Sequence, residues 1–302
     1  MTLPNFLIIG AGRAGTTSMY NYLNQHPQIF MSPVKEPRFF AYVNNKPEYK
    51  GPPLGINNLE RYSTDLSSYK KLFSQVSNET AIGEASVDYL YLHSSAERMK
   101  VYIPDVKIII ILRQPVDRAY SQFWARVSSG MEPLTDFFQA MEAEDERMRN
   151  NWPPQFHYKQ KSFYASSLKH YFQLFDKSQI KIILYDDYSK DPKQTLNEIT
   201  NFLGVNNVFE FDLNRRYNSP RGLAKFQFIN KIRSSRSWVK TTLKDLIPSS
   251  FLTYLRNAYN SLQFSRRPSL DKKLRKELTS IYIEDILEVE KLIKRDLSEW
   301  MK

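Results

Sequence analysis

The sequence predicts an α/β fold in which a doubly wound parallel sheet is flanked by helices. Apolar stretches with the composition of buried strands lie at 5–10, 108–112 and 180–185, and each precedes a segment with a helical pattern. Strands that alternate with helices along a chain form parallel sheets. The stretch "VKIIIIL" is apolar on both faces, as the central strands of such sheets are.

The first half of the chain begins with the predicted strand at 5–10. A glycine-rich loop leads from it into a helix expected from about Thr16 to Gln25. The proline in "HPQI" ends this helix, because a residue before proline avoids helical geometry. Residues 41–68 are rich in Pro, Gly, Asn and Tyr, which is typical of a long surface loop. A short apolar segment then precedes "GEASVDYL".

The second half is expected to contain a series of helices. Pro115 suits the first position of the helix that follows the central strand, and a charged helix follows at about 136–149. Ser162 is placed to cap the helix in "FYASSLKHYFQLF", and Gly204 to end the helix in "DPKQTLNEITNFLG". A long amphipathic helix is predicted near 271–297.

The 302 residues are interpreted as one domain, with a mainly helical part at 221–302 packed on it. The sequence has no cysteine, which excludes disulfides and favours a reducing compartment. It shows no signal peptide, and its longest aliphatic run is too short to cross a bilayer. Its four histidines lack the spacing of metal ligands. We therefore expect a cytoplasmic protein without a metal site or transmembrane segment, and the sequence gives no view of its oligomeric state.

The positive charge of the chain is concentrated near its C-terminus. Residues 221–276 contain fourteen Lys or Arg residues but only two acidic ones, Asp245 and Asp271. Such a stretch forms either helices with solvated basic faces or a surface that attracts an anion. Its aromatic residues follow no nucleic-acid-binding motif, so no nucleic-acid partner is expected. A basic anion-binding module without catalysis remains one alternative for the function.

The glycine-rich loop fits two phosphate-binding motifs. Gly10, Gly12 and Gly15 match G-x-G-x-x-G, and the same stretch has P-loop spacing except that Thr16 stands where the lysine is expected. A dinucleotide site needs a second strand that ends in an acidic residue about 20 positions later. The corresponding segment, "HPQIFMSPVKEP", is broken by two prolines and does not read as a strand.

A P-loop nucleotide kinase is the second alternative. It needs the missing lysine and a buried strand that ends in an aspartate for Mg²⁺. The most apolar strand ends in Arg113 instead, although Asp186 after "IILY" keeps this alternative open.

The substitutions favour a third interpretation, a P-loop-like turn that binds a dianion without a metal. The helix N-terminus, the hydroxyls of Thr16 and Thr17, and the charge of Arg13 would hold the anion. Arg113 ends a parallel strand and marks a second anion site, which the Ser121 hydroxyl could also reach. One nucleotide with phosphate groups at both ends would satisfy both sites.

The chain resembles the sulfotransferases that use 3′-phosphoadenosine 5′-phosphosulfate (PAPS), most of all the bacterial members related to heparan-sulfate-type sulfotransferases. "IIGAGRAGTTSMYNYLNQHP" is similar to their 5′-phosphosulfate loop, and "ILRQPVDRAYSQF" to their 3′-phosphate motif. Further similar segments are "SPVKEPRFF", "GEASVDYL", "SFYASSLKHYF", "FLG" and "DILEVEKLIKRDLSEW". The resemblance implies transfer of a sulfuryl group from PAPS to a hydroxyl or amine of a carbohydrate or small metabolite, with release of adenosine 3′,5′-bisphosphate (PAP).

The resemblance also implies a set of site residues. The donor-binding residues would be Gly12, Arg13, Ala14, Gly15, Thr16, Thr17, Ser18, Arg113, Ser121, Tyr164, Arg221 and Gly222. Many members carry lysine at the position of Arg13, and arginine stabilises charge but rarely transfers a proton. Glu84 is the first candidate for the base by analogy and Glu36 the second, while His93 and His157 are weaker candidates. Aromatic residues in 38–62, together with 151–158, could line the acceptor cleft.

Overall fold

Five parallel strands form the central sheet of the protein. The computed structural model describes residues 2–45, 47–51, 62–214, 223–224, 264–265 and 268–302. The strands are β1 (Phe6–Gly10), β2 (Ile29–Met31), β3 (Ala81–Ala85), β4 (Lys107–Leu112) and β5 (Ile180–Leu184), in the spatial order β2-β3-β1-β4-β5. All four pairings are parallel, and β4 pairs with β5 from Ile108 opposite Ile180 to Leu112 opposite Leu184. The predicted doubly wound parallel sheet is confirmed.

The strand β2 was not expected from the sequence. The two prolines of its segment, Pro27 and Pro33, lie outside the three residues that pair with β3. A short strand at the sheet edge therefore keeps its backbone donors while the prolines occupy the flanking turns.

The strand order places a topological switch point beside β1. Within the sheet, β2 and β3 lie on one side of β1. The chain then crosses to β4, which lies on the other side of β1. The ends of β1 and β4, which are direct neighbours, thus point their following loops to opposite sides. Ligands of open α/β sheets bind at such a switch point, outside the carboxyl ends of the strands.

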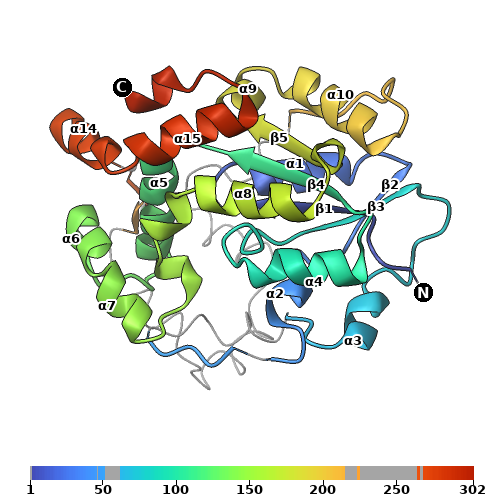
Figure 1. Cartoon of the computed structure of the whole chain (residues 1–302), viewed down its shortest axis with the longest axis horizontal. Coiled ribbons are helices and arrows are strands. Elements are labelled where there is room, and N and C mark those ends of the chain that lie inside the picture. The colour runs from blue at the N-terminus through green and yellow to red at the C-terminus, as the bar shows by residue number, and fades with distance from the viewer. Residues whose placement is uncertain (1, 46, 52–61, 215–222, 225–263, 266–267) are drawn as a thin grey trace, which may run out of the picture.

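Helices cover both faces of the sheet. Figure 1 shows α4 (Ser94–Tyr102) and α8 (Ala165–Leu174) on the face toward the viewer, and α1 (Thr16–Leu23) behind the sheet. The other helices are α2 (Phe39–Tyr42), α3 (Leu66–Lys71), α5 (Pro115–Ser128), α6 (Phe137–Glu142), α7 (Glu144–Arg149), α9 (Tyr185–Lys190), α10 (Pro192–Leu203), α14 (Lys272–Ser280) and α15 (Ile283–Ile293). Short 3₁₀ turns are η1 (Pro154–Phe156), η2 (Gln160–Ser162), η3 (Lys177–Gln179) and η4 (Ser298–Met301), and β6 (Leu223–Ala224) pairs with β7 (Phe264–Ser265).

Two helices expected to be continuous are each divided in two. The segment 136–149 breaks near Ala143, and the break places buried Glu144 where it accepts hydrogen bonds from the backbone N–H groups of 159 and 160. The segment 271–297 breaks before Tyr282, whose fully buried ring packs on Phe163 at 4.8 Å. In both places a tertiary contact outweighs the helical periodicity.

The cap of α8 also differs from the expectation. Ser162 lies in η2, where its hydroxyl accepts a hydrogen bond from Arg118 at 2.6 Å. The carboxylate of Asp285, on α15, accepts instead from the N–H groups of Tyr164 at 2.8 Å and Ala165 at 3.0 Å. The predicted C-terminal glycine of α10, Gly204, is confirmed by its left-handed conformation.

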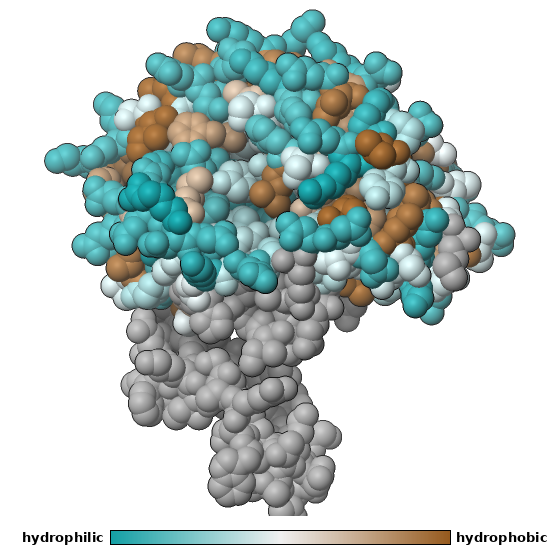
Figure 2. All heavy atoms as spheres, turned by 60° about the horizontal axis from the view of Figure 1, so that its bottom comes forward, coloured by the Kyte–Doolittle hydropathy of each residue, from teal (hydrophilic) through white to brown (hydrophobic). Residues whose placement is uncertain are grey.

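The visible surface is mainly hydrophilic. Figure 2 shows hydrophobic side chains scattered among hydrophilic ones over the coloured part of that face. Within the described part of the chain, no helix combines the length and apolarity needed to span a bilayer.

Candidate active site

The loop between β1 and α1 has the geometry of an anion-binding turn. Arg13 and Gly15 adopt left-handed conformations with φ of 75° and 88°, and such residues occur in the backbone nests that bind anions. Gly15 is the N-cap of α1, and no side chain caps it. Thr16 and Thr17 are the first helical residues and do not act as caps, so the N–H groups of the first turn can serve a ligand.

Gly15 cannot be replaced without a clash. A Cβ atom there would lie 2.9 Å from the Tyr188 ring of α9, in a backbone conformation that other residues rarely adopt. A Cβ atom on Gly12 would meet Val87 at 3.3 Å. The loop is therefore held between the segment after β3 and helix α9.

The two predicted phosphate sites meet at Arg13. Its Nε donates a hydrogen bond to the Ser121 hydroxyl on α5 at 3.1 Å, and its carbonyl accepts one from Arg113 at 3.0 Å. The Arg113 guanidinium also lies over the Tyr185 ring, 4.6 Å from its centre. The backbone carbonyl of Arg113 accepts a hydrogen bond from the Tyr164 hydroxyl at 2.9 Å. Residues 100 or more positions apart thus form one basic site at the switch point.

This arrangement fits a nucleotide with two phosphate groups. Two guanidinium groups, one hydroxyl and an uncapped helix N-terminus converge there, and each favours an anion. Ala14 and Ser18 lie in the same loop and helix, as the sequence predicted. Arg221 and Gly222, expected to complete the 3′-phosphate site, lie outside the described residues, as does most of the basic stretch 221–276.

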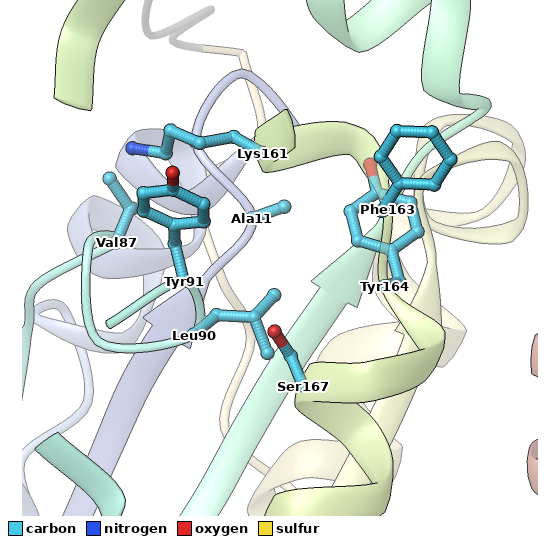
Figure 3. A pocket seen from close by; sticks show the side chains of 9 residues that line it. Ala11, Val87, Leu90, Tyr91, Lys161, Phe163, Tyr164 and Ser167 are labelled. Atoms are coloured by element: carbon cyan, nitrogen blue, oxygen red, sulfur yellow. The ribbon is translucent and has the colours of Figure 1, made fainter. Parts of the chain in front are cut away.

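A small pocket lies beside the loop on the side of α8. Figure 3 shows Ala11 between Val87, Tyr91 and Lys161 on one side and Phe163 and Tyr164 on the other. Its lining is completed by Gly12, Leu90 and Ser167. The donor loop and the residues around Lys161 therefore line the same pocket.

Glu36 lies at the edge of the donor loop. Its carboxylate accepts a hydrogen bond from the Val87 N–H at 3.1 Å, and the Val87 side chain faces Gly12. Two cations flank the carboxylate: Lys35 at 3.0 Å and Arg38 at 3.4 Å. Its side chain is 23% exposed, so a ligand can reach it.

Glu84 is placed differently. It is fully buried in β3, an inner strand of the sheet, where its Oε1 accepts hydrogen bonds from Tyr89 at 2.7 Å and Tyr69 at 3.3 Å. Burial raises the pKa of Glu84 to about 7. The same burial keeps an acceptor molecule from touching it in this conformation.

The histidines serve structural contacts. Burial lowers the pKa of His157 to about 4, and its ring bridges the Tyr91 hydroxyl at 3.0 Å and the Trp152 carbonyl at 3.1 Å. His93 stacks on His170 at 5.0 Å. In the described ranges, no three His, Asp or Glu side chains are gathered as metal ligands.

One cluster was missed by the sequence analysis. Buried Asp88 forms ion pairs with Arg38 at 3.2 Å and with Lys161 of η2. The charged residue inside the apolar segment "SVDYL" was the available signal. Its partners are 50 and 73 positions away, so the pairing could not be read from spacing.

Comparisons with known proteins agree with this site. Residues 4–210 match the model of the family described as "Sulfotransferase family". A solved sulfotransferase from Alicyclobacillus acidocaldarius is 31% identical with a TM-score of 0.77, and each chain is covered completely.

Curated relatives are longer than this chain. The bifunctional heparan sulfate N-deacetylase/N-sulfotransferase 4 of Mus musculus is 28% identical over 228 residues, which are 73% of this chain and 24% of that protein. Carbohydrate sulfotransferase 15 of Homo sapiens is 24% identical over 265 residues, which cover 69% of this chain and 45% of that protein. The chain thus spans about a quarter of the first relative and less than half of the second.

The chain belongs to the sulfotransferase family. The predicted resemblance to PAPS-type sulfotransferases is confirmed at the level of the family, and the predicted fold is that of its solved relative.

The buried carboxyl group of Glu84 predicts a pH-dependent stability. Its pKa is raised from 4.5 to about 7 in the folded protein, so its stabilising contribution is complete below pH 4.5 and is lost as the pH rises to about 7. We expect the contribution of Glu84 to the free energy of unfolding to fall by roughly 3 kcal/mol across this range, while His157, whose pKa burial lowers, contributes a change of the opposite sign. Glu84→Gln, which stays neutral, should remove most of this fall. Urea unfolding at pH 4.5 and at pH 7 measures the free energy of unfolding, with Glu198→Gln, at an exposed position, as the control. The same pH dependence in Glu84→Gln as in the wild-type protein would contradict the prediction.

Proposed function

We propose that this protein transfers a sulfuryl group from PAPS to a hydroxyl or amine of a carbohydrate or small-metabolite acceptor and releases PAP. The observation that carries the proposal is the meeting of Arg13, Arg113 and Ser121 at the switch point of the sheet. Family membership supports the donor, because the loop and the β4–α5 turn are the segments that resemble the family's two phosphate motifs.

In this proposal the donor lies across the carboxyl ends of β1 and β4. Its 5′-phosphosulfate would be held by the backbone N–H groups of 12–18 and by the Thr16 and Thr17 hydroxyls, and its 3′-phosphate by Arg113 and Ser121. Tyr164 would act through its hydrogen bond to the Arg113 carbonyl, which fixes the β4–α5 turn. Arg221 and Gly222 stay a prediction for closing the 3′ side.

The chemistry requires charge stabilisation and a base. The bond from sulfur to the donor's bridging oxygen breaks while a new bond forms from sulfur to the acceptor oxygen or nitrogen. Arg13 would stabilise the negative charge that develops on the leaving oxygen. The acceptor proton would pass to Glu36, because Glu36 is accessible beside Val87 and the loop, whereas Glu84 is buried.

The acceptor is expected to approach along an aromatic path. Tyr42 stacks on Tyr62 at 5.3 Å, and Arg38 lies over the Tyr62 ring at 4.7 Å before reaching Glu36. Tyrosine rings with neighbouring polar groups suit a ring with hydroxyl groups. The names of the heparan sulfate and carbohydrate relatives support a saccharide among the acceptors. We also place the protein in a bacterial cytoplasm, which its similarity to the Alicyclobacillus protein supports.

The two alternatives have less support. Asp186, the candidate magnesium ligand of a nucleotide kinase, accepts a hydrogen bond from the Trp300 indole at 2.9 Å and belongs to the packing of the C-terminus. The basic binding module rests on 221–276, most of which lies outside the described residues.

Removal of the Arg113 guanidinium should weaken PAP binding about 100-fold, because two charge-assisted hydrogen bonds to the 3′-phosphate are lost. Binding of AMP, which lacks that phosphate, should be weak and should fall much less, because it loses only the support that Arg113 gives to the donor loop. Isothermal titration of Arg113→Ala with both ligands measures this. The control is Arg275→Ala, which removes a guanidinium that is bound to Asp117 of α5. Equal wild-type affinity for PAP and AMP would contradict a 3′-phosphate site.

The base is tested with two isosteric variants. Screening hydroxyl and amine compounds with radiolabelled PAPS would first provide an acceptor. With it, Glu36→Gln should lower kcat at least about 100-fold, because a general base is lost. Glu84→Gln should lower kcat less than about tenfold, because Glu84 does not touch the acceptor. A larger loss of kcat in Glu84→Gln than in Glu36→Gln would instead identify Glu84 as the base.

A further inference from the structure

A chain of ion pairs runs beside the donor loop. It leads from Lys35 to Glu36, then to Arg38, to Asp88 and finally to Lys161. The side chain of Asp88, which lies between Arg38 and Lys161, is 1% exposed, and those of Arg38 and Lys161 are 11% and 8% exposed. These charges are therefore shielded little by solvent, and each influences its neighbours strongly.

Arg38 is shared between two carboxylates. Its Nε lies 3.4 Å from the carboxylate of Glu36 and 3.2 Å from that of Asp88. Because both oxygens face one nitrogen, they lie no more than about 7 Å apart. Arg38 also adopts a left-handed backbone conformation, with φ of 55°.

Asp88 is ionised in the folded protein. Burial alone would raise its pKa, but Arg38 and Lys161 together hold the pKa of Asp88 below its usual range. Burial lowers the pKa of Lys161, and the carboxylate of Asp88, which pairs with its ammonium group, opposes this lowering. The centre of the cluster thus carries one negative and two positive charges.

This arrangement bears on the proposed base. An arginine paired with a single carboxylate stabilises the ionised form of that carboxylate and makes it a weaker base. Arg38 would do so to Glu36 if Asp88 were absent. We propose that Asp88 is a positioning residue that draws Arg38 toward itself and so preserves the basicity of Glu36. The inference rests on the proposed role of Glu36 in sulfuryl transfer.

Lys161 has the opposite effect in the same balance. It neutralises Asp88 from η2, and in Figure 3 it lies on the side of the pocket that Val87 and Tyr91 occupy. Without Lys161, the full charge of Asp88 would act on Arg38, and Glu36 would become more basic. Asp88 therefore raises the basicity of Glu36, and Lys161 lowers it.

No neighbouring group is expected to override this balance. The groups that face Asp88 are Arg38, Lys161, Arg126, His157, Tyr42, Tyr49 and Tyr91. Arg126 acts on Asp88 from α5 and is the same in the wild-type protein and in both variants below. The low pKa of His157 keeps it neutral near pH 7, and burial raises the pKa of each of the three tyrosines. The charged neighbours of Glu36 are Lys35, Arg38 and Glu84. All three are the same in Asp88→Asn and Lys161→Gln, the variants used in the test.

The test follows the Glu36 carboxyl group directly. In protein labelled with ¹³C-glutamate, the resonance absent from Glu36→Gln identifies Glu36, and its midpoint is measured by NMR over the pH range in which the protein stays folded. Asp88→Asn should lower this midpoint by about one pH unit, and Lys161→Gln should raise it by about one. Lys181→Gln and Asp187→Asn each remove one charge from an ion pair away from the cluster and should leave it unchanged.

Opposite shifts support the inference, and shifts in the same direction, or none in either variant, would overturn it. If Asp88→Asn does not fold, an upward shift in Lys161→Gln alone supports the inference and its absence overturns it. The titration needs neither donor nor acceptor, so its result is independent of PAP binding. Failure of wild-type protein to bind PAP would instead contradict the proposed function.

Discussion

The hydrogen bond from the Arg113 guanidinium to the Arg13 carbonyl is the contact on which the site depends. It joins the loop after β1 to the turn after β4, the two segments that the strand order brings together at the switch point. Each of the two guanidinium groups also has an oxygen or aromatic partner, Ser121 for Arg13 and Tyr185 for Arg113. The fixed positive charge then favours a doubly anionic ligand.

The C-terminal helices hold this site in place. The carboxylate of Asp285 caps α8 next to Tyr164, whose hydroxyl binds the Arg113 carbonyl. The Gln114 side chain, directly after Arg113, donates a hydrogen bond to the Trp300 carbonyl at 3.1 Å. Residues at the end of the chain therefore fix the geometry of residues that would bind the donor, which gives the C-terminal part a direct influence on the proposed reaction.

The sequence predicted the features that depend on local patterns. The buried strands, Pro115 at the start of α5 and the glycine end of α10 follow from apolar runs and backbone preferences. Ser162, the two divided helices and the Asp88 cluster could not be predicted, because each depends on a contact between distant residues. For the base, analogy favoured Glu84 over Glu36. The two carboxyl groups are distinguished by burial, since Glu84 is fully buried in the inner strand β3 and Glu36 is partly exposed beside the donor loop.

A crystal structure of the protein with PAP would test the central claim most directly. The account predicts that one nucleotide spans both sites, with its 3′-phosphate within hydrogen-bonding distance of Arg113 and Ser121 and its 5′-phosphate on the backbone of the loop after β1. A nucleotide whose 3′-phosphate lies away from the Arg113 guanidinium would contradict it.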